Sequence, residues 1–148
     1  MVSPVSLFAV VQHPRFTIFA LAPSTDAVPL GLAVHHPRGR RVCWAPETEG
    51  VRHNPADLAS SLQTFIARHL PPDTPAILLT LDYAAIRPLS PPAMIWPCPV
   101  VQTQALADLF AVSPPESDAA PALLDWWLTV LQPGLPQNTT LYDLLRSV

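Results

Sequence analysis

The residues best suited to bind a charged partner are arginines gathered around a short turn. Arg38, Arg40 and Arg41 lie close together, and Trp44 follows them. Guanidinium groups grip phosphate, and an aromatic ring beside them can stack on a base. The cluster therefore predicts a local binding site for nucleic acid or a protein partner. A second interpretation stays open, because an exposed turn in a chain with little charge also needs solvating groups.

The histidines do not have the spacing of a metal site. Imidazoles are common ligands for transition metals, and His35 and His36 are adjacent in the sequence. Neighbouring residues on a strand point to opposite faces of a sheet, so these two side chains cannot easily bind one ion. His13 and His53 stand apart from them. We therefore expect structural histidines here and no zinc.

Composition limits the possible partners. The chain has 148 residues, of which 49% are hydrophobic and 13% charged, with a net charge of −3. No overall field draws such a protein to nucleic acid or to an anionic membrane, so any nucleic-acid contact must be local. Sparse charge also leaves apolar patches exposed. We expect self-association or a protein partner, and no membrane.

The predicted location is the cytoplasm. Apolar stretches such as Phe16–Ala22 are shorter than the about 20 residues that span a bilayer, and Met1–Val11 lacks the features of a signal peptide. Cys43 and Cys98 have no CxxC spacing. They predict two buried thiols in a reducing compartment.

The strands and helices that would position these groups are expected to form one α/β domain over residues 1–148. Four apolar runs rich in β-branched and aromatic residues predict strands joined as an antiparallel meander, at Ser6–Val11, Phe16–Ala22, Leu30–His35 and Arg40–Ala45. The last two runs are joined by a tight turn containing proline and glycine. The expected fold is a mixed sheet in which a three-stranded antiparallel meander precedes helix-strand units.

A helix over Pro55–Leu70 is the most strongly indicated element. Asn54 can cap it, Pro55 suits its first position, and apolar residues recur at helical spacing. The following run, Ala76–Leu81, is continuously apolar and predicts a central strand buried on both faces. A helix followed by such a strand indicates a crossover unit.

Prolines divide the second half of the chain. Proline-rich loops are predicted at 84–99 and 113–121, with a short strand over Pro99–Gln102. Thr103 is expected to cap a helix that runs to about Val112.

A last long helix carries two tryptophans. Leu123, Leu128 and Leu131 mark its apolar face. Trp126 and Trp127 are consecutive, so they point to different sides of the helix. We expect one of them in the core and the other exposed at an interface.

Several short segments resemble the ribonuclease H-like superfamily, in the order that this family has them. They are spread over about half of the chain, between Phe16 and Ile86, and comprise Thr17–Phe19, Pro29–Val34, Arg38–Trp44, Asn54–Leu58 and Leu79–Tyr83. The resemblance implies a ribonuclease H-like sheet.

The resemblance also implies a place for an active site. In that family acidic residues bind two divalent ions, which position water and stabilise the leaving oxygen in phosphodiester hydrolysis. Asp57 matches the carboxylate at the start of the first helix, and Asp82 matches the one at the end of the fourth strand. Asp118 or Asp125 could supply a last acid. Leu21 stands where the first strand should carry a carboxylate.

Three hypotheses follow, of which the last is an unrelated α/β protein with a small-molecule role that the sequence does not reveal. Because Leu21 cannot bind a metal, the first is a non-catalytic or weakly catalytic ribonuclease H-like domain that acts as an interaction module and needs no cofactor. The alternative is a nuclease that uses Mg²⁺ or Mn²⁺ held by Asp57, Asp82 and Asp118. Asp57 is also explained as a carboxylate that favours the helix dipole, and Asp82 as a residue that begins a turn.

Overall fold

The structure is a computed structural model that describes part of the chain. The described residues are 16–22, 31–36, 39–45, 55–70, 76–81, 83–87, 96, 98–117, 119–136, 139–140 and 143, with the side chains of 55–58 and 85 left out.

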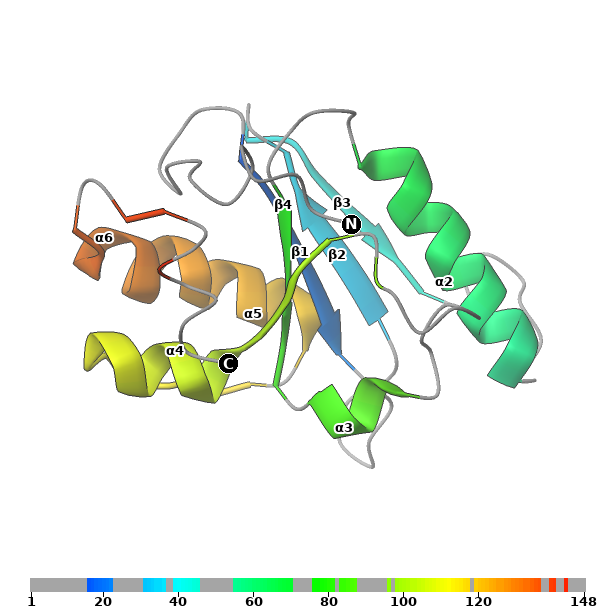
Figure 1. Ribbon diagram of the computed structural model, residues 1–148. Helices are drawn as coiled ribbons and strands as arrows, with labels where there is room; N and C mark the ends of the chain where they lie inside the picture. The colour runs from blue at the N-terminus through cyan, green and yellow to red at the C-terminus, as the bar shows by residue number, and fades with distance from the viewer. Residues whose placement is uncertain are drawn as a thin grey trace.

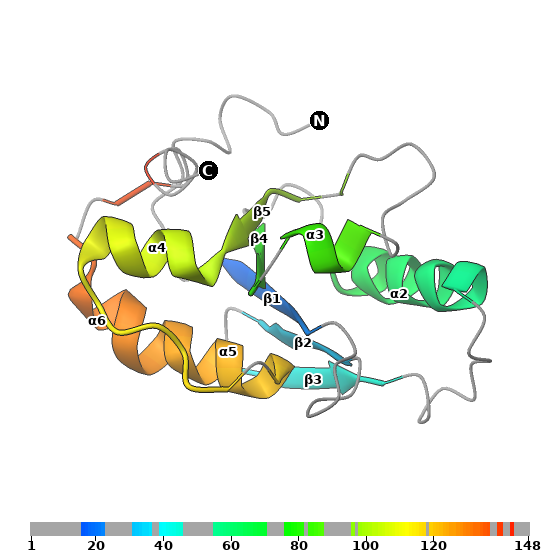
Figure 2. The same ribbon diagram turned by 90° about the horizontal axis from the view of Figure 1, so that it is seen from below.

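Five strands form one mixed sheet with the spatial order β3-β2-β1-β4-β5 (Figure 1; Figure 2 labels β5). The strands are β1 Thr17–Ala22, β2 Gly31–His35, β3 Arg41–Trp44, β4 Ala76–Thr80 and β5 Val100–Gln102. β2 is antiparallel to both β1 and β3, whereas β1, β4 and β5 are parallel to one another.

Among these strands only β2 is reversed, so the other four end at the same edge of the sheet, called here the carboxyl edge. The predicted meander and the interior position of the fourth strand are confirmed. The predicted strand over Ser6–Val11 lies outside the described residues.

Both faces of the sheet are buried under helices. Phe19 and Leu21 of β1 pack with one apolar cluster, together with Leu62 and Ile66 of α2, Pro55–His69. Ile18 and Ala20 point the other way and belong to a second cluster. Side chains alternate along a strand, so a sequence in which every residue is apolar needs cover on both sides.

The second cluster is formed with α4, Thr103–Phe110, and α5, Ala120–Trp126. Figure 2 shows α4 and α5 on one side of the sheet and α2 on the other. The helix predicted over Pro55–Leu70 and the buried strand after it are confirmed. Leu62, Phe65, Ile77 and Leu79 are buried as expected, while the side chain of Leu58 lies outside the described part.

A short helix follows β4, at residues that were predicted to lie in a loop. α3 spans Tyr83–Ile86, so residues 84–86 of the proline-rich loop expected over 84–99 are helical instead. The backbone N–H of Tyr83 donates to Oε1 of Gln102, 3.1 Å away, which ties the start of α3 to the end of β5. Ile86 is fully buried on the α2 side of the sheet.

The expectation that one tryptophan is exposed is wrong. Trp126 is 5% exposed and Trp127 is fully buried. The indole Nε1 of Trp126 donates to the backbone oxygen of Ser113, 2.6 Å away. The segment before α5 thus covers the side of the helix that faces away from Trp127, and a helix covered on two sides can bury two consecutive tryptophans.

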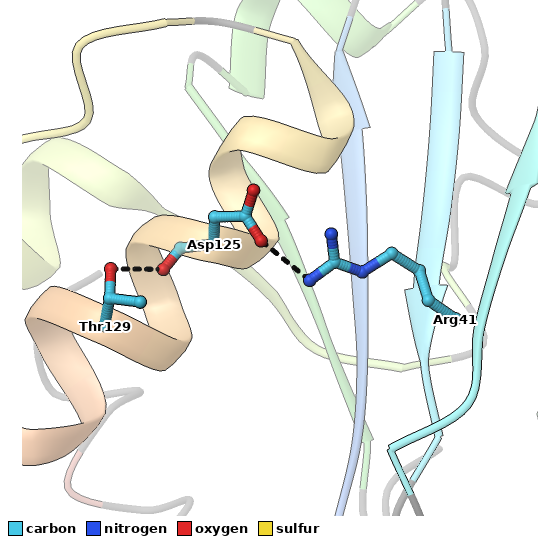
Figure 3. Close-up of polar contacts among 3 residues, drawn as sticks. All are labelled: Arg41, Asp125 and Thr129. Atoms are coloured by element: carbon cyan, nitrogen blue, oxygen red, sulfur yellow. Dashed lines mark hydrogen bonds and ion pairs between the residues drawn. The ribbon is translucent and has the colours of Figure 1, made fainter.

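The helix that contains them changes its winding after Trp126. A π-helical turn, η2, spans Trp127–Leu131, and α6, Gln132–Gly134, continues it. The hydroxyl of Thr129 donates to the backbone oxygen of Asp125, 2.7 Å away, beside the start of this turn (Figure 3). A hydroxyl that bonds to the carbonyl four residues earlier competes with the helical hydrogen bond.

Two other predictions about polar side chains are corrected. Gln102, not Thr103, is the N-cap of α4, and Thr103 is a buried first residue of that helix. Cys43 is exposed on the edge strand β3, whereas Cys98 is buried. Burial raises the pKa of the Cys98 thiol to about 12, because the thiolate would lose its hydration.

Replacing the fully buried tryptophan tests this packing. We expect Trp127→Ala to lower the free energy of unfolding by about 3–5 kcal/mol, because it removes a large side chain from the core. Val130→Ala, at a 37% exposed position in the same helix, is the matched control and should change it by less than about 0.5 kcal/mol. Chemical denaturation measures both, and a loss for Trp127→Ala as small as the control's would contradict the packing.

Candidate functional site

The ends of β1 and β4 form the place where the family resemblance puts metal-binding carboxylates. These strands are parallel neighbours, and Leu21 pairs in register with Thr80. Both side chains are fully buried. Leu21 packs in the cluster under α2, in the company of Leu32 and Leu62. An aliphatic side chain in the core therefore occupies the first-strand position.

The polar groups that the structure places at this edge are few and partly engaged. Oε1 of Gln102 already accepts the hydrogen bond from Tyr83 described above. The hydroxyl of Thr80 is buried and has no hydrogen-bond partner within the described part of the chain. Neither group carries a charge, whereas a divalent ion needs several hard, mostly anionic oxygens.

The three aspartates of the nuclease hypothesis are not placed by the structure. Asp82 and Asp118 lie outside the described residues, as does the side chain of Asp57, whose backbone is in the first turn of α2. Within the described residues no group of three His, Cys, Asp or Glu side chains could hold a metal ion.

Asp125, the other candidate for the last acid, is paired elsewhere. Its Oδ1 lies 2.8 Å from Nη2 of Arg41, at the start of β3 (Figure 3). This contact lies on the face of the sheet that α5 covers, while Leu21 and Thr80 lie at the strand ends and Leu21 faces α2. Both partners are partly exposed, so the ion pair contributes about 1 kcal/mol or less. Asp125 thus joins α5 to β3 and not to the carboxyl edge.

The predicted cluster of arginines and Trp44 is divided between the two faces of the sheet. Arg41 and Trp44 are the first and last residues of β3, so alternation along the strand points them to opposite faces. Trp44 is 3% exposed, and its ring centroid lies 6.5 Å from that of Phe65. It is therefore not free to stack on a base. Arg40 is exposed, and Arg38 lies outside the described residues.

A pair of histidines near the start of β3 was not expected from the sequence. Nε2 of His36 lies 3.2 Å from Nδ1 of His69, so one ring nitrogen donates and the other accepts. The ring of His69 also packs on Phe65, with centroids 4.4 Å apart. The pair joins the end of β2 to the last turn of α2. No spacing rule indicates such a contact, because 33 positions separate the partners.

Burial, and then neighbouring positive charges, lower the pKa of His35, His36 and His69. For His36 the causes are burial and then Arg40. For His69 they are burial, His36, Arg40 and Arg68, in that order. For His35, on the opposite face, they are burial, Arg41 and His36. Each imidazole therefore resists a positive charge more than a free one does.

A shallow pocket of about 180 Å³ lies between β3 and α2, near this histidine pair. Its lining residues are Trp44, Ser61, Thr64, Phe65 and Arg68. One wall is aromatic, and the other residues supply hydroxyl groups and a guanidinium. The pocket thus fits a small group with an apolar body and a negative end.

Comparison of the chain with protein-family models, with curated proteins and with solved structures gives no significant match. The helices within the described residues are too short or too polar to cross a membrane.

The histidine pair predicts a pH dependence of stability. The folded pKa values of His36 and His69 lie below the ordinary value of 6.5, so the unfolded chain binds protons first as the pH falls. Their contribution is complete above pH 6.5 and is lost as the pH falls through the lowered values. As the pH falls through this range, we expect the melting temperature of the double variant His36→Gln, His69→Gln to decrease less than that of the wild type. Equal losses in the two proteins, measured by thermal denaturation, would contradict this role.

Proposed function

We propose that this protein is a non-catalytic or weakly catalytic ribonuclease H-like domain that acts as an interaction module. The observation behind the proposal is Leu21, which is fully buried in register with Thr80 at the ends of the two central parallel strands. A catalytic carboxylate of this fold would have to stand there.

The topology supports the family part of the proposal. Three strands joined as an antiparallel meander precede a helix, and that helix leads to a strand parallel to the first. This arrangement brings the ends of β1 and β4 side by side, as a site shared between the first and fourth strands requires. The sequence segments that resemble the family have this same order.

The chemistry supports the non-catalytic part. Two-ion hydrolysis works because clustered carboxylates hold both ions against the attacking and leaving oxygens. At the β1 position Leu21 has two methyl groups where an aspartate would have two anionic oxygens. Metal ions would gain nothing from Leu21 and would have to be held by the remaining acids alone.

Large apolar side chains that remain exposed support a role in interactions. Tyr83, Leu109 and Val130 are each more than a third exposed. They lie on α3, α4 and the π-helical turn. Since Trp126 and Trp127 are both buried, these exposed side chains are available for self-association and those two tryptophans are not.

Metal addition tests the proposal. A preformed metal site is stabilised by its ion through the linkage of binding to folding. We expect millimolar Mg²⁺ or Mn²⁺ to leave the melting temperature unchanged, and we expect no hydrolysis of an RNA–DNA hybrid. Asp57→Asn and Asp82→Asn are the matched variants. Metal-dependent cleavage that both variants abolish would establish the nuclease alternative instead.

A further inference from the structure

β3 is an edge strand whose outer side has no partner strand among the described residues. It pairs only with β2, and Figure 2 shows it at the margin of the sheet. The N–H of His36 donates to the oxygen of Arg40, 2.8 Å away, just beyond the first strand pair. In an antiparallel ladder hydrogen-bonded pairs alternate, so the backbone groups of Arg41 and Cys43 point away from β2. They can pair with an added strand.

Side chains on both sides of this edge are arranged to receive an extended peptide. The pocket lined by Trp44, Phe65 and Arg68 lies on the α2 side of β3. On the α5 side Arg41 and Cys43 are exposed. An added strand would place alternate side chains over these two surfaces, which is how groove-binding domains read an extended peptide.

The charges around the edge favour an acidic partner. Arg40 and Arg68 are exposed, and within the described residues no ion pair involves either of them. Arg68 lines the pocket, where the hydroxyl of Thr64 already donates to the backbone oxygen of Ser60, 2.9 Å away. An anionic group in the pocket could thus pair with Arg68, which forms no ion pair within the described part of the chain.

We propose that β3 and α2 form a docking groove for an extended acidic peptide, which adds to the sheet beside β3 and places a glutamate side chain in the pocket against Arg68. The apolar stem of glutamate suits the aromatic wall, and its carboxylate suits the guanidinium. This inference rests on the proposed interaction role and specifies its partner.

A labelled peptide tests the groove directly. The probe is a short peptide of alternating glutamate and valine, and its binding is measured by fluorescence anisotropy at low salt. We expect Arg68→Ala to weaken binding at least tenfold, which is about 1.4 kcal/mol. Arg87→Ala removes the same charge from an exposed position after α3 and should leave binding within about twofold.

A backbone variant separates strand addition from simple charge attraction. Cys43→Pro removes an outward N–H and leaves the ladder with β2 intact, because Cys43 does not bond to β2. We expect it to abolish peptide binding. If this variant does not fold, amide hydrogen exchange in the wild type gives the same answer, since peptide addition should protect the amides of Arg41 and Cys43.

Any of three results would contradict the proposed docking groove. They are equal binding of a lysine–valine peptide, binding that is unchanged by Arg68→Ala, and no protection of the β3 amides. A further result would change the identity of the partner. If the peptide does not bind, but a single-stranded oligonucleotide binds and Arg68→Ala abolishes that binding, the groove is a site for nucleic acid and not for a peptide. The two proposals can fail independently. If the peptide does not bind, the expected results with metal ions and with the RNA–DNA hybrid are unchanged. If the hybrid is hydrolysed, the proposed function is refuted, whether or not the peptide binds.

Discussion

The complete burial of β1 is the constraint on which the rest of the structure depends. All of its residues, from Thr17 to Ala22, are buried, and they are apolar apart from Thr17. A strand of this kind must lie between two neighbouring strands and under helices on both faces, because each exposed apolar face would cost free energy. β2 and β4 supply the neighbours, α2 covers one face, and α5 with its π-helical continuation covers the other.

The same burial determines where charge can be placed. The two central strands contain no ionisable side chain, so the charged groups that the structure describes lie at the margins of the sheet and on the helix surfaces. Arg40 and Arg41 lie at the start of β3, and Arg68 and His69 end the helix beside it. Within the described residues, charged side chains therefore gather near the start of the edge strand β3 and not at the ends of β1 and β4.

Local patterns were sufficient to predict much of the fold. The helix at 55–69 was indicated by its proline and its apolar spacing, and β4 by a continuous apolar run. Alternation along a strand also implies that Arg41 and Trp44 face opposite ways. The prediction of one binding site from the arginines and Trp44 did not take this alternation into account. The pairing of His36 with His69 depends on how the end of α2 meets the end of β2, which no local pattern contains. The burial of Trp126 likewise depends on a hydrogen bond to Ser113, in a segment whose path over the helix is set by tertiary packing.

Paramagnetic relaxation by Mn²⁺ tests the central claim most directly, because it reports on the ends of β1 and β4 themselves. The amide resonances of Leu21, Ala22 and Thr80 would be recorded as Mn²⁺ is added to the wild-type protein. If these strand ends are core, the resonances will keep their line widths while exposed amides near surface acids broaden weakly and without saturation. Selective, saturable broadening of Leu21 and Thr80 would show an ion bound between the strands and would contradict the account.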